Sequence, residues 1–532
     1  MQLWKSIKLH LEGPKKEALR NKARRMSEKV LKEAFVSNLN GTSLTEITLG
    51  LSVPPVCVVC RGLLLILYHL QWGELKCSWQ CSLLLDFILL VVPVVLSCTI
   101  LSPILLFVPL CLSALCTITL CVLYTKRNNY VRLNFKEIID VLLNTKLKSN
   151  NVPSVTVLRV LINILTAVSI LAVDFPLFPR RYAKTETYGT GVMDFGVGGY
   201  IFANALVSPE ARQHCGVLQK KGSSLTKQII SVWPLAFLGV CRFISVKAVD
   251  YHEHMSEYGV HWNFFFTLAV VRIGASVVLT ILPVYKSWMM AVFLAVMYQL
   301  TLETTTLKMF ILNGSDGTGT REGFLNANRE GVFSVFGYLA IYMAGVQVGL
   351  YVLRKRTMIG DWVKAIGFLL VTSFTLFIIF HILQVYIEAN SRRMANLPFI
   401  VWVVAQCLAF LSTIFFADLV LIFAQHLING SKVPCTWNFS NALLKNKKTD
   451  ESFFSSSTKD QNQSDPCLIN AINRNQLLFF LLANVMTGLV NTLIDTIHSS
   501  NSFSLSVLLL YMFCNCLVMY ILHVKSITLK FW

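Results

Sequence analysis

One short stretch combines an acid, three cations and two prolines directly after an apolar segment. Residues 174–184 read DFPLFPRRYAK, and they follow residues 155–173, which are rich in apolar side chains. The prolines end a helix there, and a carboxylate at the edge of a bilayer must be paired, hydrated or neutralised. Asp174 could take the proton of an alcohol, while Lys184 steadies charge that grows on a carbonyl oxygen. An ordinary helix end with its charges in water remains the alternative.

The composition indicates that the surrounding chain is a membrane protein. Of its 532 residues, 55% are hydrophobic and 14% are charged, and the mean hydropathy is +0.60. The hydrophobic share is higher, and the charged share lower, than in typical soluble domains. Apolar runs recur, most of them close to the roughly 20 residues that cross a bilayer as a helix. The sequence therefore predicts an all-α, polytopic membrane protein with about 13 transmembrane helices. The runs are 47–70, 83–100, 103–124, 155–173, 191–207, 229–246, 264–283, 288–302, 332–353, 365–386, 397–423, 477–494 and 503–524.

The excess of positive charge is explained better by orientation in a membrane than by nucleic-acid binding. The net charge is +19, but the cations lie between apolar runs, and no aromatic-interleaved basic domain is present, so we expect no nucleic-acid partner. Cations gather in the loops after odd-numbered runs, which predicts that these loops and the C-terminus are cytosolic and that the N-terminus is lumenal. The basic N-terminus disagrees, and a start at Met26 would remove most of that conflict. The 15 cysteines lie largely in apolar runs and are interpreted as small apolar fillers.

These features divide the chain into three segments. Residues 1–46 form a basic N-terminal segment, of which 1–25 are expected to be a dispensable extension. Residues 47–525 form the transmembrane domain, with a polar, mobile cytosolic linker at 426–475, and 526–532 form a C-terminal tail. Among the glycosylation sequons, Asn40 and Asn313 would face the lumen, whereas Asn429, Asn438 and Asn462 fall in the linker.

The loops predicted on the lumenal side carry most of the remaining polar candidates. Asp194 lies three residues into the fifth run, and an acid so near the membrane usually lines a cavity. The nearby Gly196, Gly198 and Gly199 favour close helix packing over a dinucleotide site. His261 and Asn263 precede run seven and could donate hydrogen bonds to a polar headgroup. The loop 314–323 could present backbone N–H groups to a phosphate, with Arg321 or Arg329 closing over it, or it could be a flexible loop around a glycan.

Other patterns are weaker, and several reaction classes lack their motifs. His252, His254 and His261 with Glu253 and Glu257 fit no standard zinc spacing, so we predict no metal site. Thr487, Asn491 and Asp495 share one helix face, as do His381, Gln384 and Glu388; either stripe could line a cavity or bond helices together. Charged residues within the runs suggest only buried pairing or snorkelling: Arg61, Asp86, Arg159, Arg242, Arg272 and Asp418. No G-x-S-x-G, Walker A or H-E-x-x-H motif occurs.

Several long strings resemble one family. LAVDFPLFPRRYAK at 171–184, continuing TETYGTGVMDFGVGG, is similar to the inositol acyltransferases of glycosylphosphatidylinositol (GPI) anchor biosynthesis. The likeness continues through YGVHWNFFF at 258–266, LNANREG at 325–331, SRRMANL at 391–397 and the closing FW. It covers essentially everything from Met26 onward, and the stretch before Met26 is not part of the family pattern.

The resemblance implies an enzyme of the endoplasmic reticulum membrane. Such enzymes transfer a fatty acyl group, commonly palmitoyl, from acyl-CoA to the inositol 2-hydroxyl of glucosaminyl-phosphatidylinositol. The expected partners are therefore that lipid, acyl-CoA as co-substrate and membrane lipid, with no tightly bound cofactor. A lipid transporter or scramblase is the alternative, because polar residues within helices would serve a conduit equally well, and a non-catalytic scaffold is a third possibility.

By resemblance, Asp174 and Lys184 match the acid and the lysine regarded as catalytic. The hypothesis is that Asp174 is the general base and that Lys184 orients the hydroxyl or stabilises the thioester oxyanion, although the two roles could be swapped. Arg180, Arg181 and Arg329 would hold the phosphate. The complete set of predicted substrate-binding residues is Arg180, Arg181, Asp194, His261, Asn263, Asn326, Arg329, Arg392 and Asn396.

Overall fold

The chain is a bundle of helices. The computed structural model describes residues 35, 37, 39–73, 78–126, 134–147, 152–212, 230–249, 255–428, 431–437 and 467–529. Within these residues the regular structure is helical, and the β-type pairing is limited to two isolated bridges, Gly41 with Thr190 and Lys146 with Met358. The predicted all-α class is confirmed.

Each predicted apolar run forms helix. The long helices are α2 (Leu44–Trp72), α3 (Trp79–Asp86) continued by a π-turn and α4 (Val92–Ser97), α5 (Phe107–Thr125), α7 (Pro153–Ala172), α13 (Phe264–Ile281), α14 (Ser287–Thr304), α17 (Arg329–Val352), α18 (Ile359–Tyr386), α19 (Leu397–Leu427), α21 (Gln476–Leu493) and α22 (Asn501–Val524). Shorter helices are α6 (Phe135–Leu143), α8 (Val192–Leu206), α9 (Pro209–Arg212), α11 (Trp233–Val249), α12 (Met255–Tyr258), α15 (Leu307–Asn313), α16 (Phe324–Ala327) and α20 (Leu468–Arg474).

Fewer helices are long and apolar enough to cross a membrane than the sequence predicts. Among the described residues, 10 helices are long and apolar enough to cross a membrane, and α14 with α15, bent by 79°, would make 11. The apolar helices α8 and α11 are shorter. The chain is therefore a multi-pass membrane protein, but the count of about 13 is not confirmed.

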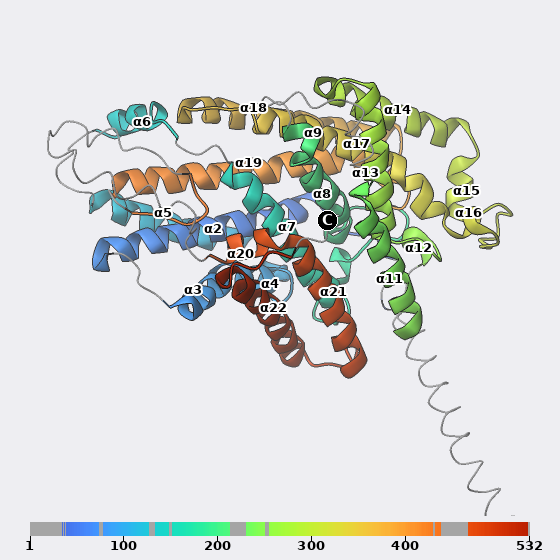
Figure 1. Cartoon of the computed structure of the whole chain (residues 1–532), viewed down its shortest axis with the longest axis horizontal. Coiled ribbons are helices and arrows are strands. Elements are labelled where there is room, and N and C mark those ends of the chain that lie inside the picture. Colours follow the sequence, from blue (N-terminus) through green and yellow to red (C-terminus); the bar gives the residue numbers. More distant parts are fainter. Residues whose placement is uncertain are drawn as a thin grey trace, which may run out of the picture.

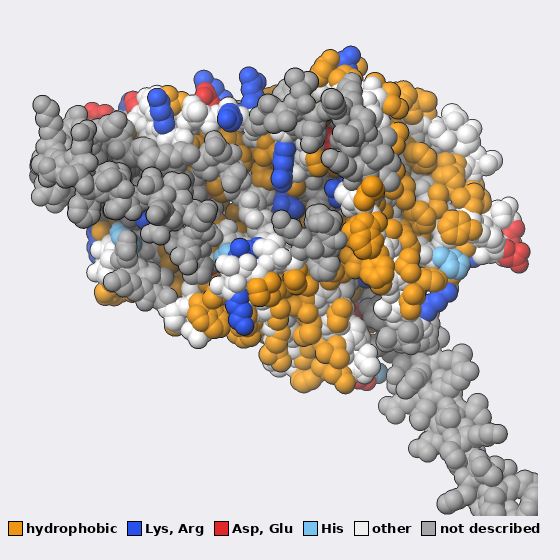
Figure 2. All heavy atoms as spheres, viewed as in Figure 1, with side chains coloured by type: hydrophobic (Ala, Val, Ile, Leu, Met, Phe, Trp, Pro, Cys, Tyr) orange, Lys and Arg blue, Asp and Glu red, His pale blue; other side chains and the backbone are white. Residues whose placement is uncertain are grey.

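Helix α19 lies at the centre of the bundle. Asn396 caps its first turn by accepting from the backbone N–H of Phe399, and Pro398 lies in that turn, where a missing N–H costs nothing. Figure 1 shows α18, α19 and α2 side by side, and α17, α7 and α8 also pack against α19. In the most apolar 18-residue stretch of α19, 67% of the residues are buried, whereas the corresponding stretches of α18 and α21 are 22% buried. The outer helices instead expose large apolar side chains, which cover α13, α14, α21 and α22 in Figure 2.

Small residues set the closest helix contacts. A Cβ on Gly198 would lie 2.6 Å from a methyl carbon of Val403, so the predicted close packing is confirmed there and joins α8 to α19. On α17, a Cβ on Gly345 would lie 2.9 Å from the carbonyl oxygen of Phe202 in α8. Gly196 differs, because a Cβ there would meet nothing within 4 Å.

The loops predicted to be lumenal meet at one end of the bundle. The Thr42 N–H donates to the Thr190 carbonyl at 2.6 Å, and the Gly189 N–H donates to the Asn390 carbonyl at 2.8 Å. The hydroxyl of Ser391 donates to the Thr187 carbonyl. Loops predicted to be cytosolic pair with each other instead, as where the Leu147 N–H donates to the Thr357 carbonyl at 2.9 Å.

Parts of the predicted segments lie outside the described residues, namely residues 1–34, 36, 38, 429–430, 438–466 and 530–532, and the sequons at Asn429, Asn438 and Asn462 are among them. What is described of the linker packs into the fold, since Val433, Trp437 and Leu468 are buried. In the tail, the Leu529 N–H donates to Asn475. Of the two predicted glycosylation sites, Asn40 is exposed, whereas Asn313 is half-buried at the end of α15.

Candidate active site

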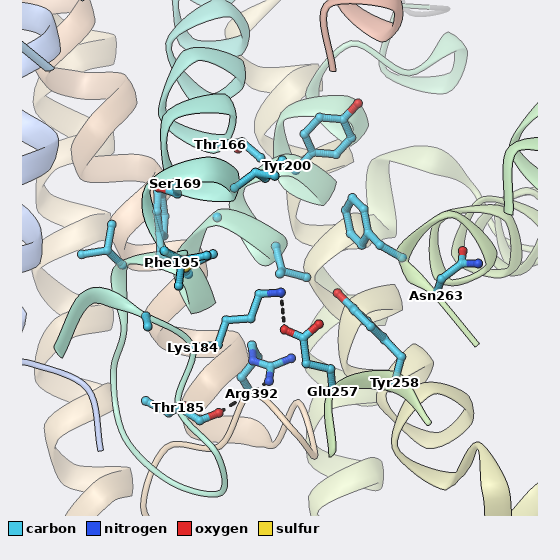
Figure 3. Close-up of a pocket in the computed structure, with 18 of the residues that line it drawn as sticks. Thr166, Ser169, Lys184, Thr185, Phe195, Tyr200, Glu257, Tyr258, Asn263 and Arg392 are labelled. Atoms are coloured by element: carbon cyan, nitrogen blue, oxygen red, sulfur yellow. Dashed lines mark hydrogen bonds and ion pairs between the residues drawn. The ribbon is translucent and has the colours of Figure 1, made fainter. Parts of the chain in front are cut away.

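A cavity of about 250 Å³ opens among α7, α8, α11, α12, α13 and α21. Side chains from three turns of α7, beginning at Ile162, supply an apolar wall. Polar groups gather where α7 ends: Asp174, Lys184, Thr185, Glu257 and Arg392. Figure 3 shows the Lys184 ammonium directed at the Glu257 carboxylate, with Arg392 beside this pair. The cavity therefore has an apolar wall and a charged end.

The end of α7 places Asp174 in the cavity. The helix ends at Ala172, and Arg180 holds the turn that follows, because its Nη2 donates to the carbonyls of Val173 and Phe175, each at 2.9 Å. Asp174 is 5% exposed and accepts a hydrogen bond of 2.6 Å from Nδ2 of Asn491 in α21. Burial lowers the pKa of Arg180 to about 10, partly offset by the charge of Asp174. Arg180 thus shapes the turn and adds positive charge close to the acid.

Lys184 follows the 3₁₀ turn Arg180–Tyr182 and forms an ion pair with Glu257 of α12. The two side chains are 32% and 20% exposed, so the pair is in contact with the cavity. An ammonium group has three N–H donors. Glu257 fixes the direction of this group and leaves donors for a bound molecule.

A fully buried ion pair stands behind Lys184. Asp194 is 0% exposed, and its Oδ1 lies 2.7 Å from Nε of Arg392. Asp194 also accepts from the hydroxyl of Thr185 at 2.8 Å and from its N–H at 3.1 Å, so it anchors the residue next to Lys184. Burial lowers the pKa of Arg392, but the carboxylates of Asp194 and Glu257 outweigh this and raise it above its usual range.

The opposite wall is held by two asparagines. Asn263 caps α13 by accepting from the N–H groups of Phe265 and Phe266, and its Nδ2 donates to the carbonyl of Gly239 in α11 at 2.8 Å. One turn further along α11, Nη1 of Arg242 donates to Oδ1 of Asn484 in α21 at 2.7 Å. Arg242, Asn263 and Asn484 all line the cavity.

Four of the predicted site residues line this cavity, namely Asp174, Lys184, Asn263 and Arg392, and Asp194 binds Arg392 from behind. Arg180, Arg181 and His261 do not line it. The guanidinium of Arg180 is directed at backbone carbonyls, Arg181 pairs with Glu46 at 2.8 Å and is 43% exposed, and His261 is exposed.

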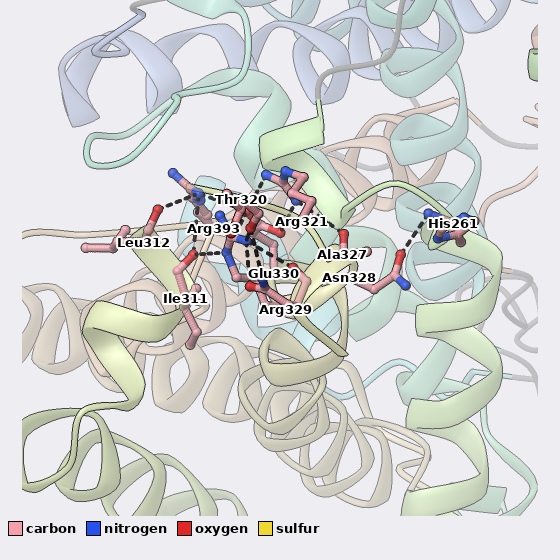
Figure 4. Close-up of polar contacts among 11 residues, drawn as sticks. His261, Ile311, Leu312, Thr320, Arg321, Ala327, Asn328, Arg329, Glu330 and Arg393 are labelled. Atoms are coloured by element: carbon pink, nitrogen blue, oxygen red, sulfur yellow. Dashed lines mark hydrogen bonds and ion pairs between the residues drawn. The ribbon is translucent and has the colours of Figure 1, made fainter. Parts of the chain in front are cut away.

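The other three predicted residues, Asn326, Arg329 and Asn396, do not line the cavity, and Figure 4 shows the network around Arg329. Arg329 donates to the carbonyls of Ile311, Thr320 and Asn326. Asn326 donates to the Thr320 carbonyl at 2.9 Å, and Asn396 serves as the cap of α19. All of these contacts are within the protein, so they hold the loops in place and leave few donors for a phosphate.

Comparison with known proteins identifies the family. The family model described as GWT1 matches residues 28–522. The chain belongs to the GWT1 family. A cattle relative, glucosaminyl-phosphatidylinositol-acyltransferase PIGW, is 52% identical over 512 residues, which cover 95% of this chain and 100% of that protein. The human protein of the same name is 47% identical, with the same coverage. GPI-anchored wall transfer protein 1 of Yarrowia lipolytica is 33% identical over 95% of this chain and 99% of that protein. The resemblance drawn from the sequence strings is thereby confirmed.

In this GWT1-family chain, sequence reasoning gave no cavity role to Glu257, Arg242, Thr185 or Asn484. The sequence pattern around Glu257 suggests only a possible metal ligand. The described residues hold no group of three His, Cys, Asp or Glu side chains that could bind a metal, while His252, Glu253 and His254 lie outside them. The signal for Arg242 was its position within an apolar run, where a charge is expensive.

Proposed function

We propose that this GWT1-family acyltransferase moves a fatty acyl group from acyl-CoA to the inositol 2-hydroxyl of glucosaminyl-phosphatidylinositol. Family membership and the names of the relatives support acylation of this lipid. The structural observation that carries the proposal is that Asp174 and Lys184 line one cavity with an apolar wall. An acid, a cation and space for a hydrocarbon chain are what this transfer requires.

In the proposed step, the inositol oxygen attacks the thioester carbonyl carbon. Its proton passes to the carboxylate of Asp174, the new C–O bond forms, and negative charge collects on the carbonyl oxygen. Lys184 donates a hydrogen bond to that oxygen. The C–S bond then breaks, and Asp174 returns the proton to the leaving CoA sulfur.

The fixed surroundings of both groups favour this assignment. The Asn491 amide orients the Asp174 carboxylate, and Glu257 orients the Lys184 ammonium. Groups held in advance need little reorganisation during the reaction. Between Ile162 and Val173 the α7 wall is roughly 16 Å long, which gives a long acyl chain room beside the acid.

We further propose that the protein resides in the endoplasmic reticulum membrane, with a lumenal N-terminus and a cytosolic C-terminus. Two observations support this orientation. The loops rich in cations lie after odd-numbered runs, and the loops predicted to be lumenal meet beside the charged end of the cavity.

The proposal is tested with purified protein, palmitoyl-CoA and a glucosaminyl-phosphatidylinositol analogue, by following free CoA thiol and acylated lipid. We expect the wild type to release CoA and Asp174→Asn and Lys184→Met to release none, at normal protein levels. Lys355→Gln, at an exposed position between α17 and α18 and outside the cavity, serves as a charge-removal control and should remain active. A wild type that only moves lipid between leaflets would reject the acyl transfer, and full activity in either cavity variant would reject that residue's role.

A further inference from the structure

Three cationic side chains line the cavity, and two of them face carboxylates. Lys184 pairs with Glu257, and Arg392 lies 2.7 Å from Asp194. Arg242 differs, because its partner is the neutral amide of Asn484. Within the described part of the chain, no carboxylate lies at ion-pair distance from this guanidinium.

Arg242 lies where a positive charge without a nearby carboxylate is unfavourable. It lies in α11, a helix whose neighbouring side chains Phe237, Val240 and Ile244 are apolar and exposed. A cation in such a helix usually pairs with an anion or faces a polar cavity. A guanidinium has five N–H donors, and the Asn484 oxygen takes one of them.

Both neighbouring amides are arranged to hold Arg242 without neutralising it. Nδ2 of Asn484 donates to the Phe480 carbonyl at 2.8 Å, and this bond turns the amide oxygen toward Arg242. Asn263 fixes α11 one turn earlier, through the Gly239 carbonyl. The guanidinium is therefore oriented in the cavity wall while its charge is left for a ligand to balance.

Helix α21 relates this arginine to the reacting acid. Asn484 and Asn491 are seven residues apart, which places them on the same face about 10 Å apart along the helix. The first amide contacts Arg242, and the second contacts Asp174. A molecule with its reacting group near Asp174 could thus reach Arg242 with an anionic group.

We infer that Arg242, oriented by Asn484, binds a phosphate ester of a substrate. The inference rests on the proposed function, because both substrates proposed there carry such a group, either the phosphodiester of the inositol lipid or the phosphates of CoA. Arginine suits this role, since its planar donors match phosphate oxygens.

The first test measures KM for each substrate separately with purified full-length protein. Arg242→Gln should raise KM for one substrate by about 10- to 150-fold, the value of hydrogen bonds to a charged group, and Arg242→Lys should raise it less. A rise for the lipid alone assigns Arg242 to the phosphodiester, and a rise for palmitoyl-CoA alone assigns it to the CoA phosphates. Lys355→Gln, at an exposed position between α17 and α18, should leave both values unchanged. Values within about twofold of wild type for both substrates in Arg242→Gln would overturn the inference.

A second variant covers the case in which Arg242→Gln does not fold. Asn484→Asp keeps the side-chain size and gives Arg242 an internal carboxylate, so it should weaken phosphate binding while Arg242 remains. The readout is the thermal stabilisation of the protein by glycerophosphoinositol and by coenzyme A, which needs no turnover. We expect one of them to stabilise the wild type and to lose that effect in Asn484→Asp; equal stabilisation in both proteins, or none in the wild type, contradicts the subsite. A wild type that releases no CoA thiol refutes the proposed function instead.

Discussion

The ion pair between Lys184 and Glu257 gives the sharpest prediction about catalysis. Glu257→Gln keeps the size of the side chain and removes its charge. The pair is partly exposed, at 32% and 20%, and such pairs contribute at most about 1 kcal/mol to stability. The variant should therefore fold and accumulate almost normally. Its effect should fall on the orientation of the Lys184 ammonium.

The size of that effect follows from the contact that is lost. A hydrogen bond to a charged group is worth about 1.5–3 kcal/mol, and each 1.36 kcal/mol changes a rate tenfold. If Lys184 donates to the oxyanion only in the transition state, kcat should fall by about 10- to 150-fold with little change in KM. Glu257→Asp, which keeps the charge one methylene further away, should recover part of the rate.

The assay is single-turnover acyl transfer by purified protein, with melting temperature measured on the same samples. Glu322→Gln makes the same chemical change at an exposed loop position and should behave as wild type. An unchanged kcat in Glu257→Gln would refute the positioning role. A large loss of melting temperature with normal activity per folded molecule would show that Glu257 holds the fold instead.

Three further predictions concern other parts of the cavity and its surroundings. Asp194→Asn leaves Arg392 buried without its carboxylate and should destabilise the protein by about 3–5 kcal/mol, visible as a lower melting temperature. Gly196→Leu should extend into the cavity, where a Cβ meets nothing within 4 Å, so it should shorten the preferred acyl chain in a competition among acyl-CoAs, whereas Gly196→Ala should change little. Burial raises the pKa of Glu388, but hydrogen bonds from Lys308 and its neighbours outweigh this and leave it lowered. Its stabilisation is therefore present at neutral pH and is lost progressively as the pH falls from about 4 through the lowered pKa of the folded state, so Glu388→Gln should lower the melting temperature at pH 7 and by less as the pH is lowered.

Local sequence patterns predict the helices and point to Asp174 and Lys184 as the central residues of the candidate site. Apolar runs showed where helices form, because each membrane-crossing segment must satisfy its own backbone hydrogen bonds. Asp174 and Lys184 are ten residues apart and are joined by a turn that contains two prolines, so their presence at one cavity is largely a local property. The stripe of Thr487, Asn491 and Asp495 reaches the candidate site only in part. Asn491 donates to Asp174, whereas Asp495 is exposed and pairs with His498 at 2.9 Å.

The remaining site depends on contacts between distant helices, which local patterns do not encode. Arg180 follows Asp174 closely in sequence, yet its side chain turns back to the carbonyls at the end of α7. Asn484 is 242 residues from Arg242, and no spacing rule connects them. Side-chain direction is set by tertiary packing, so local spacing favours the nearby arginines as phosphate ligands and gives the distant Arg242 no role.

The partner of an arginine side chain helps to separate structural from functional positions in this bundle. Arg329 donates to the carbonyls of Ile311, Thr320 and Asn326, and Arg61 pairs with Asp86 outside the cavity. Both guanidinium groups have their partners within the fold, so a ligand would gain little from them. Arg242 is held by an amide that orients its charge but does not cancel it. Because an unbalanced cation in an apolar helix is unfavourable, we expect Arg242 to be stabilised most when an anionic substrate is bound.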